Sequence, residues 1–161
     1  MSKKYVITDP CYILPEEDWR KCCDYADKTS KEDNNDWSEI FHTAVEMALT
    51  RFTNASSWAD STGFGDWNNC LWGPKIDGTG AFFADSGMVC VCEYTSKVAE
   101  ALGDLTEKDG AAVFEAEGPI KVEFDRSDSS WTIVNIEDAN GDCWHTDIPY
   151  DEEEDEEDEE W

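Results

Sequence analysis

Ten consecutive carboxylates, from Asp151 to Glu160, precede the last residue of the sequence, Trp161. Such a run of like charge cannot pack into a core, so we expect residues 151–161 to form a disordered polyacidic tail. The acid is not confined to this tail. Residues 1–150 hold 29 of the 39 acids and all 12 bases, a formal charge of −17 out of −27 for the whole chain. Any fold of this chain must therefore keep many carboxylates in contact with water.

Residues 1–150 contain enough apolar mass for one folded domain. Hydrophobic residues make up 40% of the chain and aromatic residues 12%, including eight Trp, which suits a single globular domain of this length. The seven Cys are odd in number and include adjacent Cys22 and Cys23, which favours reduced thiols over a disulfide framework. No apolar run approaches the ~20 residues of a membrane span, and the residues after Met1 lack the apolar region of a secretory signal. We expect a cytoplasmic protein that does not bind membranes.

Periodicity predicts helices in the first third of the domain. A helix is expected to begin after Pro15 and to bury Trp19, Cys22, Cys23 and Ala26, with the polar residues 27–36 forming a loop. The next helix is the clearest periodic signal, and its core-facing residues recur with helical spacing over four turns: Trp37, Ile40, Phe41, Ala44, Val45, Ala48, Leu49 and Phe52. A short helical segment is predicted over Ser96–Leu102, with Gly103 ending it.

The remaining pattern predicts an antiparallel sheet. Alternating or apolar segments bounded by Gly, Pro, Asn and Asp predict strands over residues 5–8, 81–84, 88–94, 111–117, 120–125, 131–137 and 142–148. Asn140-Gly141 is a hairpin signal. The segment Thr62–Gly80 shows little periodicity, and its residues 63–69 are expected to form a tight loop. The fold class is therefore α+β. We expect one domain over residues 1–150, an antiparallel β-meander or open barrel with two packed α-helices.

The tail favours binding to a basic partner. An extended chain rises about 3.3 Å per residue, and one DNA strand carries a phosphate every ~3.4 Å. An acidic tail can therefore occupy a phosphate-binding groove, and a terminal Trp ring can stack beside it. Plain solubilisation is the alternative. The predicted partner-binding residues are Asp151, Glu152, Glu153, Glu154, Asp155, Glu156, Glu157, Asp158, Glu159, Glu160 and Trp161, followed by the acids in Glu32–Asp36 and Asp104–Asp109.

The run of acids that ends in an aromatic residue, Asp151–Trp161, resembles the C-terminal tails of phage and bacterial single-stranded DNA-binding proteins. In that family the tail recruits replication partners and competes with DNA for the protein's own groove. The resemblance implies a replication accessory. The acidic body departs from the family because it lacks a basic surface in bulk, so direct binding of nucleic acid is not favoured.

Three short motifs resemble small uncharacterised proteins encoded by phages. They are YVITDPCYIL at residues 5–14, TGFGD at residues 62–66 and ADSGMVCV at residues 84–91. The resemblance implies that the protein originates in a phage or its host, and that it is located in the host cytoplasm if a phage encodes it. It does not indicate an activity, because the function of these proteins is unknown.

The same motifs contain a possible pocket. Asp9, Cys11, Tyr12, Asp66 and Asp85 carry side chains that can serve acid–base or nucleophilic chemistry if they converge. The alternative is turn architecture, in which Asp caps local amides and Gly supplies positive φ. The sequence contains no P-loop, Ser-His-Asp order or paired-histidine motif. We therefore predict no catalytic residues and favour a binding protein over an enzyme.

A metal site is a further alternative. Cys90 and Cys92 lie two apart on one predicted strand, and Cys143 and His145 repeat that spacing on another. Side by side, the two strands would form a Cys3His zinc site, although buried Cys more often acts as a small hydrophobe. Residues 138–142 lack the bidentate Glu of a calcium loop and predict a hairpin turn. We expect no metal or other cofactor.

Together these features predict an acidic, phage-type binding protein. It would inhibit or adapt a host nucleic-acid-binding protein by presenting DNA-like or RNA-like negative charge, as an anti-defence protein does. One alternative is a small-ligand-binding protein or hydrolase that uses the pocket around Asp9. The other is the single-stranded DNA-binding accessory. The oligomeric state is left open by the sequence.

Overall fold

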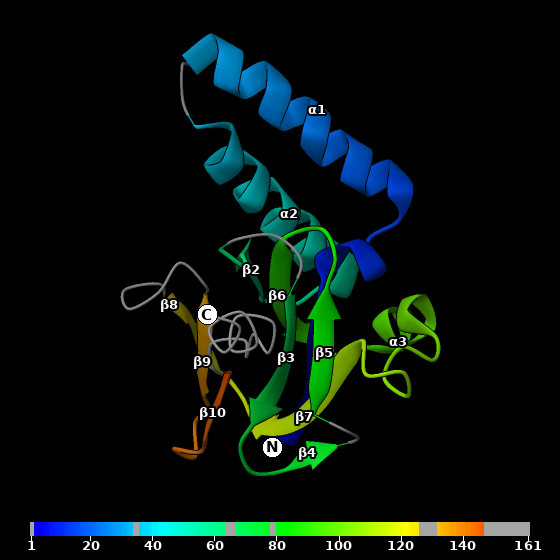
Figure 1. Cartoon of the computed structure of the whole chain (residues 1–161), viewed down its shortest axis with the longest axis vertical. Coiled ribbons are helices and arrows are strands. Elements are labelled where there is room, and N and C mark those ends of the chain that lie inside the picture. Colours follow the sequence, from blue (N-terminus) through cyan, green and yellow to red (C-terminus); the bar gives the residue numbers. More distant parts are fainter. Residues whose placement is uncertain (1, 34–35, 64–66, 78–79, 126–131, 147–161) are drawn as a thin grey trace, which may run out of the picture.

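The computed structural model describes residues 2–33, 36–63, 67–77, 80–125 and 132–146. The expected tail and Asp66 lie outside these ranges. In the described part, three α-helices combine with two five-stranded antiparallel sheets (Figure 1). Neither sheet closes into a barrel. The α+β class with antiparallel sheets, expected from the sequence, is confirmed.

Sheet 1 forms the middle layer of the domain. Its strand order is β2 (Ser57–Ser61), β6 (Met88–Glu93), β1 (Ser2–Thr8), β7 (Ala111–Glu117), β4 (Ile76–Asp77). In β6, Cys90 and Cys92 belong to the core beneath the helices, whereas Val89 and Val91 belong to the core between the sheets. Both faces of sheet 1 are therefore covered, which explains why its central strands are apolar runs without alternation.

Sheet 2 packs on one side of sheet 1 only. Its strand order is β5 (Ala81–Ala84), β3 (Trp67–Trp72), β10 (Cys143–Thr146), β9 (Ile133–Glu137), β8 (Lys121–Asp125). Strands β8, β9 and β10 pair in sequence order, which is the predicted meander. Phe82, Ile136 and Trp144 point into the core between the sheets. Cys143 and His145 alternate with Trp144 and are exposed on the outer face.

The helices cover the opposite side of sheet 1. Helix α2 (Trp37–Thr53) begins at Asp36, whose side chain accepts a hydrogen bond from the N–H of Ser38 (3.0 Å), and ends at Asn54 in the left-handed conformation (φ 57°). Its buried face, which includes Val45 and Leu49, packs into the core beneath the helices. Helix α1 (Glu16–Asp33) packs on α2, and Figure 1 shows it on the far side of α2 from the sheets.

The expected loop over residues 27–36 is wrong, because α1 continues to Asp33. This segment is polar because it is exposed, and Lys and Glu are good helix formers. Asp27 also accepts a hydrogen bond from the Trp37 indole N–H (2.6 Å), which ties α1 to the start of α2. The short helix α3 (Ser96–Leu102) and its end at Gly103 are confirmed.

The expected loop over residues 63–69 is wrong at residues 67–69, which belong to β3, and the weakly periodic segment Thr62–Gly80 also contains β4. The sequence pattern failed here because β3 carries adjacent Asn68 and Asn69 and buries Leu71 next to the exposed Trp72. Its strand conformation is set by pairing with β5, which follows shortly after it in the chain, and with β10, which is distant in the sequence. Tertiary pairing therefore decides this segment.

Replacing Phe114 should destabilise the domain strongly. Phe114 has no exposed surface and its ring lies 5.8 Å from that of Tyr5 and 5.2 Å from that of Trp144. We expect Phe114→Ala to lower the free energy of unfolding by about 3–5 kcal/mol, measured by urea denaturation. Trp72→Ala is the control, because Trp72 is 49% exposed, and should cost less than about 1 kcal/mol. Equal losses in the two variants would contradict the assignment of the core between the sheets.

Candidate functional site

The first candidate site is built around Asp9, which follows the last residue of β1 and has no exposed surface. Its Oδ2 accepts hydrogen bonds from the N–H groups of Asp85 and Ser86, both at 2.6 Å. Its Oδ1 accepts from the N–H of Cys11 (2.9 Å) and from the hydroxyl of Ser86 (2.7 Å). These donors stabilise a buried carboxylate that would otherwise be costly to remove from water.

The Asp9 contacts join the two sheets. Residues 85–87 are the turn by which the chain passes from β5 in sheet 2 to β6 in sheet 1. Asp9 holds this turn against the end of β1, the central strand of sheet 1. Next to it, the hydroxyl of Thr8 donates to the carbonyl of Gly110 (2.7 Å), just before β7. The polar side chains at the end of β1 therefore fix the point where the chain changes sheets.

Four of the five predicted pocket residues are brought together here. The hydroxyl of Tyr12 donates a hydrogen bond to Oδ2 of Asp85. The Tyr12 ring also packs edge-on against Phe83, with 5.6 Å between ring centroids. Asp66 lies outside the described residues. The motifs at residues 5–14 and 84–91 thus meet in space and contact each other directly.

The chemistry of this cluster favours the turn role over catalysis. Burial, followed by the negative charge of Asp9, raises the pKa of the Cys11 thiol to about 12. Burial, followed by the hydrogen bond to Asp85, also raises the pKa of the Tyr12 hydroxyl. Both groups are therefore protonated at neutral pH, whereas a cysteine nucleophile requires a thiolate. The oxygens of Asp9 are already engaged by amide and hydroxyl donors.

The zinc alternative is wrong, because its four residues lie on different layers. Cys90 and Cys92 are buried beneath the helices, on the helix side of sheet 1. Cys143 and His145 are exposed on the outer face of sheet 2. Two sheets and the core between them separate the pairs. Among the described residues, no group of three or more His, Cys, Asp or Glu side chains is placed to hold a metal ion.

A second buried carboxylate, Asp138, organises the turn between β9 and β10. It accepts hydrogen bonds from the N–H groups of Asn140 (3.0 Å), Asp142 (2.9 Å) and Glu117 (2.9 Å). Burial would raise the pKa of Asp138, but these hydrogen bonds lower it below the ordinary value. Gly141 adopts a positive φ of 91° in the same turn. The predicted hairpin turn is confirmed.

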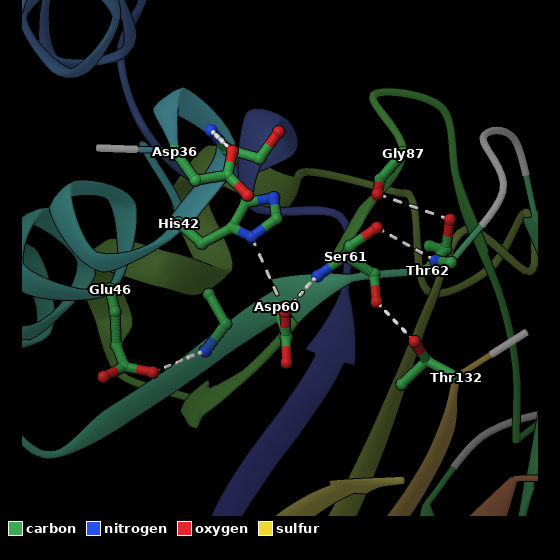
Figure 2. Close-up of polar contacts among 11 residues, drawn as sticks. Asp36, His42, Glu46, Asp60, Ser61, Thr62, Gly87 and Thr132 are labelled. Atoms are coloured by element: carbon green, nitrogen blue, oxygen red, sulfur yellow. Dashed lines mark hydrogen bonds and ion pairs between the residues drawn. The ribbon is translucent and has the colours of Figure 1, made fainter. Parts of the chain in front are cut away.

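The structure also reveals a His–Asp pair that the sequence did not indicate. Nδ1 of His42, on α2, lies 3.5 Å from Oδ1 of Asp60, on β2 (Figure 2). The two residues line a small hollow of about 190 Å³ together with Glu39, Thr43, Glu46 and Ala59. Glu46 accepts a hydrogen bond from the N–H of Ala59 (3.0 Å) and so fastens β2, the edge strand of sheet 1, to α2.

Around this pair, the polar contacts in Figure 2 are those of a structural junction. The hydroxyl of Thr132 donates to the carbonyl of Ser61 (2.6 Å), and the N–H of Thr62 donates to the carbonyl of Gly87 (2.9 Å). The Ser61 hydroxyl accepts the N–H of Gly63 (3.0 Å). These bonds hold the end of β2, the 85–87 turn and the start of β9 together. They do not assemble a Ser-His-Asp triad.

Comparison of the chain with known proteins adds no relative. No protein-family model, no curated protein and no solved structure matches it. In the described part of the chain, no helix is both long enough and apolar enough to cross a membrane.

Removing the charge of Asp9 should destabilise the domain. In Asp9→Asn the amide nitrogen would face N–H donors that now bond to a carboxylate oxygen, which leaves buried donors without an acceptor. We expect a loss of about 3 kcal/mol in the free energy of unfolding, measured by urea denaturation. The matched control is Asp85→Asn. The side chain at position 85 is exposed, and the amide oxygen of the substituted side chain can still accept the hydrogen bond from the Tyr12 hydroxyl. An Asp9→Asn loss no larger than that of the control would argue against the turn role.

The thiol of Cys11 should react slowly at neutral pH. Iodoacetamide attacks the thiolate, so the rate at Cys11 should rise about tenfold per pH unit until the pH approaches its pKa. The pKa near 12 therefore keeps Cys11 largely unmodified at pH 7, while exposed Cys143 is labelled first. Mass spectrometry of peptides from the native protein at several pH values measures both rates. Rapid labelling of Cys11 at pH 7 would instead support the nucleophile hypothesis.

Proposed function

We propose that this protein is an acidic binding protein that occupies the nucleic-acid-binding surface of a basic host protein, as a phage-encoded inhibitor or adaptor would. The observation that carries the proposal is the excess of carboxylates over bases, a formal net charge of −27 in 161 residues. Such a charge attracts a basic surface over a distance, and it raises the rate at which the two proteins meet.

Many Lys and Arg side chains in the described part of the chain already lie beside a carboxylate. They therefore offer little positive charge to a nucleic acid. These ion pairs are largely exposed and contribute little stability, but each cation is partly neutralised where it stands. The pairs are Lys3–Glu93 (3.8 Å), Arg20–Glu16 (3.1 Å), Lys21–Glu17 (3.6 Å), Lys75–Asp142 (3.7 Å) and Lys108–Asp104 (3.2 Å).

The buried carboxylates, by contrast, are stabilised mainly by hydrogen bonds rather than by ion pairs with Lys or Arg. Asp9 and Asp138 are held by N–H and hydroxyl donors of turns. Exposed acids such as Glu107 and Asp109, in a segment predicted to bind a partner, remain on the surface. The folded domain therefore carries a negative field of its own, to which the ten carboxylates of residues 151–160 add theirs.

The two alternative functions have weaker support. A single-stranded DNA-binding accessory needs a groove of uncommitted Lys and Arg, and the paired bases above disfavour it. A hydrolase at the Asp9 cluster needs a nucleophile that is ionised at neutral pH. The raised pKa of Cys11 disfavours this role for its thiol.

The proposal predicts salt-sensitive capture of a nucleic-acid-binding protein from host lysate. Three immobilised proteins are compared: the full chain, a chain ending at Tyr150, and a full-length control whose ten tail acids are changed to Asn and Gln. Capture should fall strongly between about 0.05 M and about 0.5 M NaCl, because salt screens exposed charges. It should also fall when the tail is removed or made neutral.

A competitor distinguishes mimicry from simple ion exchange. Added duplex or single-stranded oligonucleotide should release the captured protein, because both ligands would occupy one phosphate-binding surface. Capture that resists both salt and oligonucleotide would contradict the proposal. Release of many unrelated basic proteins in equal amounts would show ion exchange only and would also contradict it.

A further inference from the structure

We infer that the groove between α1 and α2 is the contact surface of a homodimer. Such a dimer is separate from the proposed function, because it uses this groove and not the carboxylates of residues 151–160. The groove follows the helical hairpin that Figure 1 shows as the outermost part of the molecule. It consists of two adjoining hollows of about 300 and about 460 Å³ that share Tyr25 and Met47.

The middle of the groove is apolar and exposed. Tyr25 on α1 is 57% exposed and Met47 on α2 is 55% exposed, and they are two of the most exposed large hydrophobic side chains in the described part of the chain. Both line the two hollows, with Ala44 beside one and Ile40 beside the other. A surface helix normally turns such residues inward, so this stripe is suited to burial against another protein.

The two ends of the groove carry opposite charge. Lys21 and Arg51 line one end, although Lys21 also lies 3.6 Å from Glu17. Asp36 and Glu39 line the other end. The polarity follows from the antiparallel hairpin, in which the last turns of α2 lie beside the first turns of α1.

This polarity suits a second copy of the same chain. If two grooves face each other across a two-fold axis perpendicular to the helices, each basic end meets the acidic end of the other copy. An axis at the level of Val45 places Arg51 opposite Glu39 of the second copy, since each lies six residues, or about 9 Å, from the axis. It also places the two apolar stripes face to face, as in a four-helix bundle. An axis parallel to the helices would instead bring like charges together.

Charge exchange between the two ends tests this geometry. Arg51→Glu should face Glu39 of its copy, and Glu39→Lys should face Arg51, so each variant alone should dimerise at least about tenfold more weakly than the wild type. In an equimolar mixture of the two variants, each interface contains one reversed and one original pair of opposite charge, so dimers should form again. Sedimentation velocity of the full chain detects dimers as twice the 18.2 kDa of one chain.

Two further variants separate the groove from general effects of charge. Lys31→Glu is the matched control, because Lys31 is exposed on α1 but does not line the groove; it should leave dimerisation unchanged. Met47→Ser removes the apolar centre and should abolish dimers without changing the circular dichroism spectrum. A monomer at all concentrations up to about 1 mM would overturn the inference, as would dimers that neither charge variant weakens.

Discussion

The Asp9 carboxylate is the contact on which the arrangement of the two sheets depends. It is fully buried, yet its partners are amide and hydroxyl donors of the 85–87 turn and of Cys11. A buried charge is tolerated only when its hydrogen bonds are made, and removing any of them exposes the full cost of desolvation. Asp9 therefore fixes where β1 ends, how the turn is shaped, and how β5 of sheet 2 connects to β6 of sheet 1.

The fold separates its charged and apolar parts by layer. Sheet 1 is covered on both faces, by the helices and by sheet 2, and supplies side chains such as Val6 and Ile7 to opposite cores. The polar residues are left to the outer faces of α1, α2 and sheet 2. Because the core requires few charged side chains, the surface can carry a large excess of acid while the domain remains packed.

The sequence predicted those parts of the fold whose pattern is local. Helix α2 followed from its periodicity and α3 from the stop at Gly103, and β7 to β10 followed from alternation and turn residues. It did not predict β3, since one of its two pairing partners, β10, is distant in the sequence. It also missed the last turns of α1, because their exposed residues are as polar as those of a loop.

At the site, the sequence motifs marked Asp9, Tyr12 and Asp85 as candidates for a pocket and offered turn architecture as the alternative. The hydrogen bonds of the structure were needed to decide in favour of the turn role. The pair of His42 and Asp60 gave no signal, since the two residues lie on separate elements. The zinc hypothesis was wrong because the equal spacing of Cys90–Cys92 and Cys143–His145 on two strands does not indicate which sheet each strand joins.

Native-state hydrogen exchange at the amides of Asp85 and Ser86 tests the role of Asp9 most directly. Residues of a surface turn ordinarily exchange by local fluctuation, far faster than core strands. If the Asp9 carboxylate holds these amides as the structure shows, their protection should match that of the amides of β1 and β6, such as Ile7 and Val91. Exchange of both amides at the rate of an open turn, while the strands remain protected, would contradict this account.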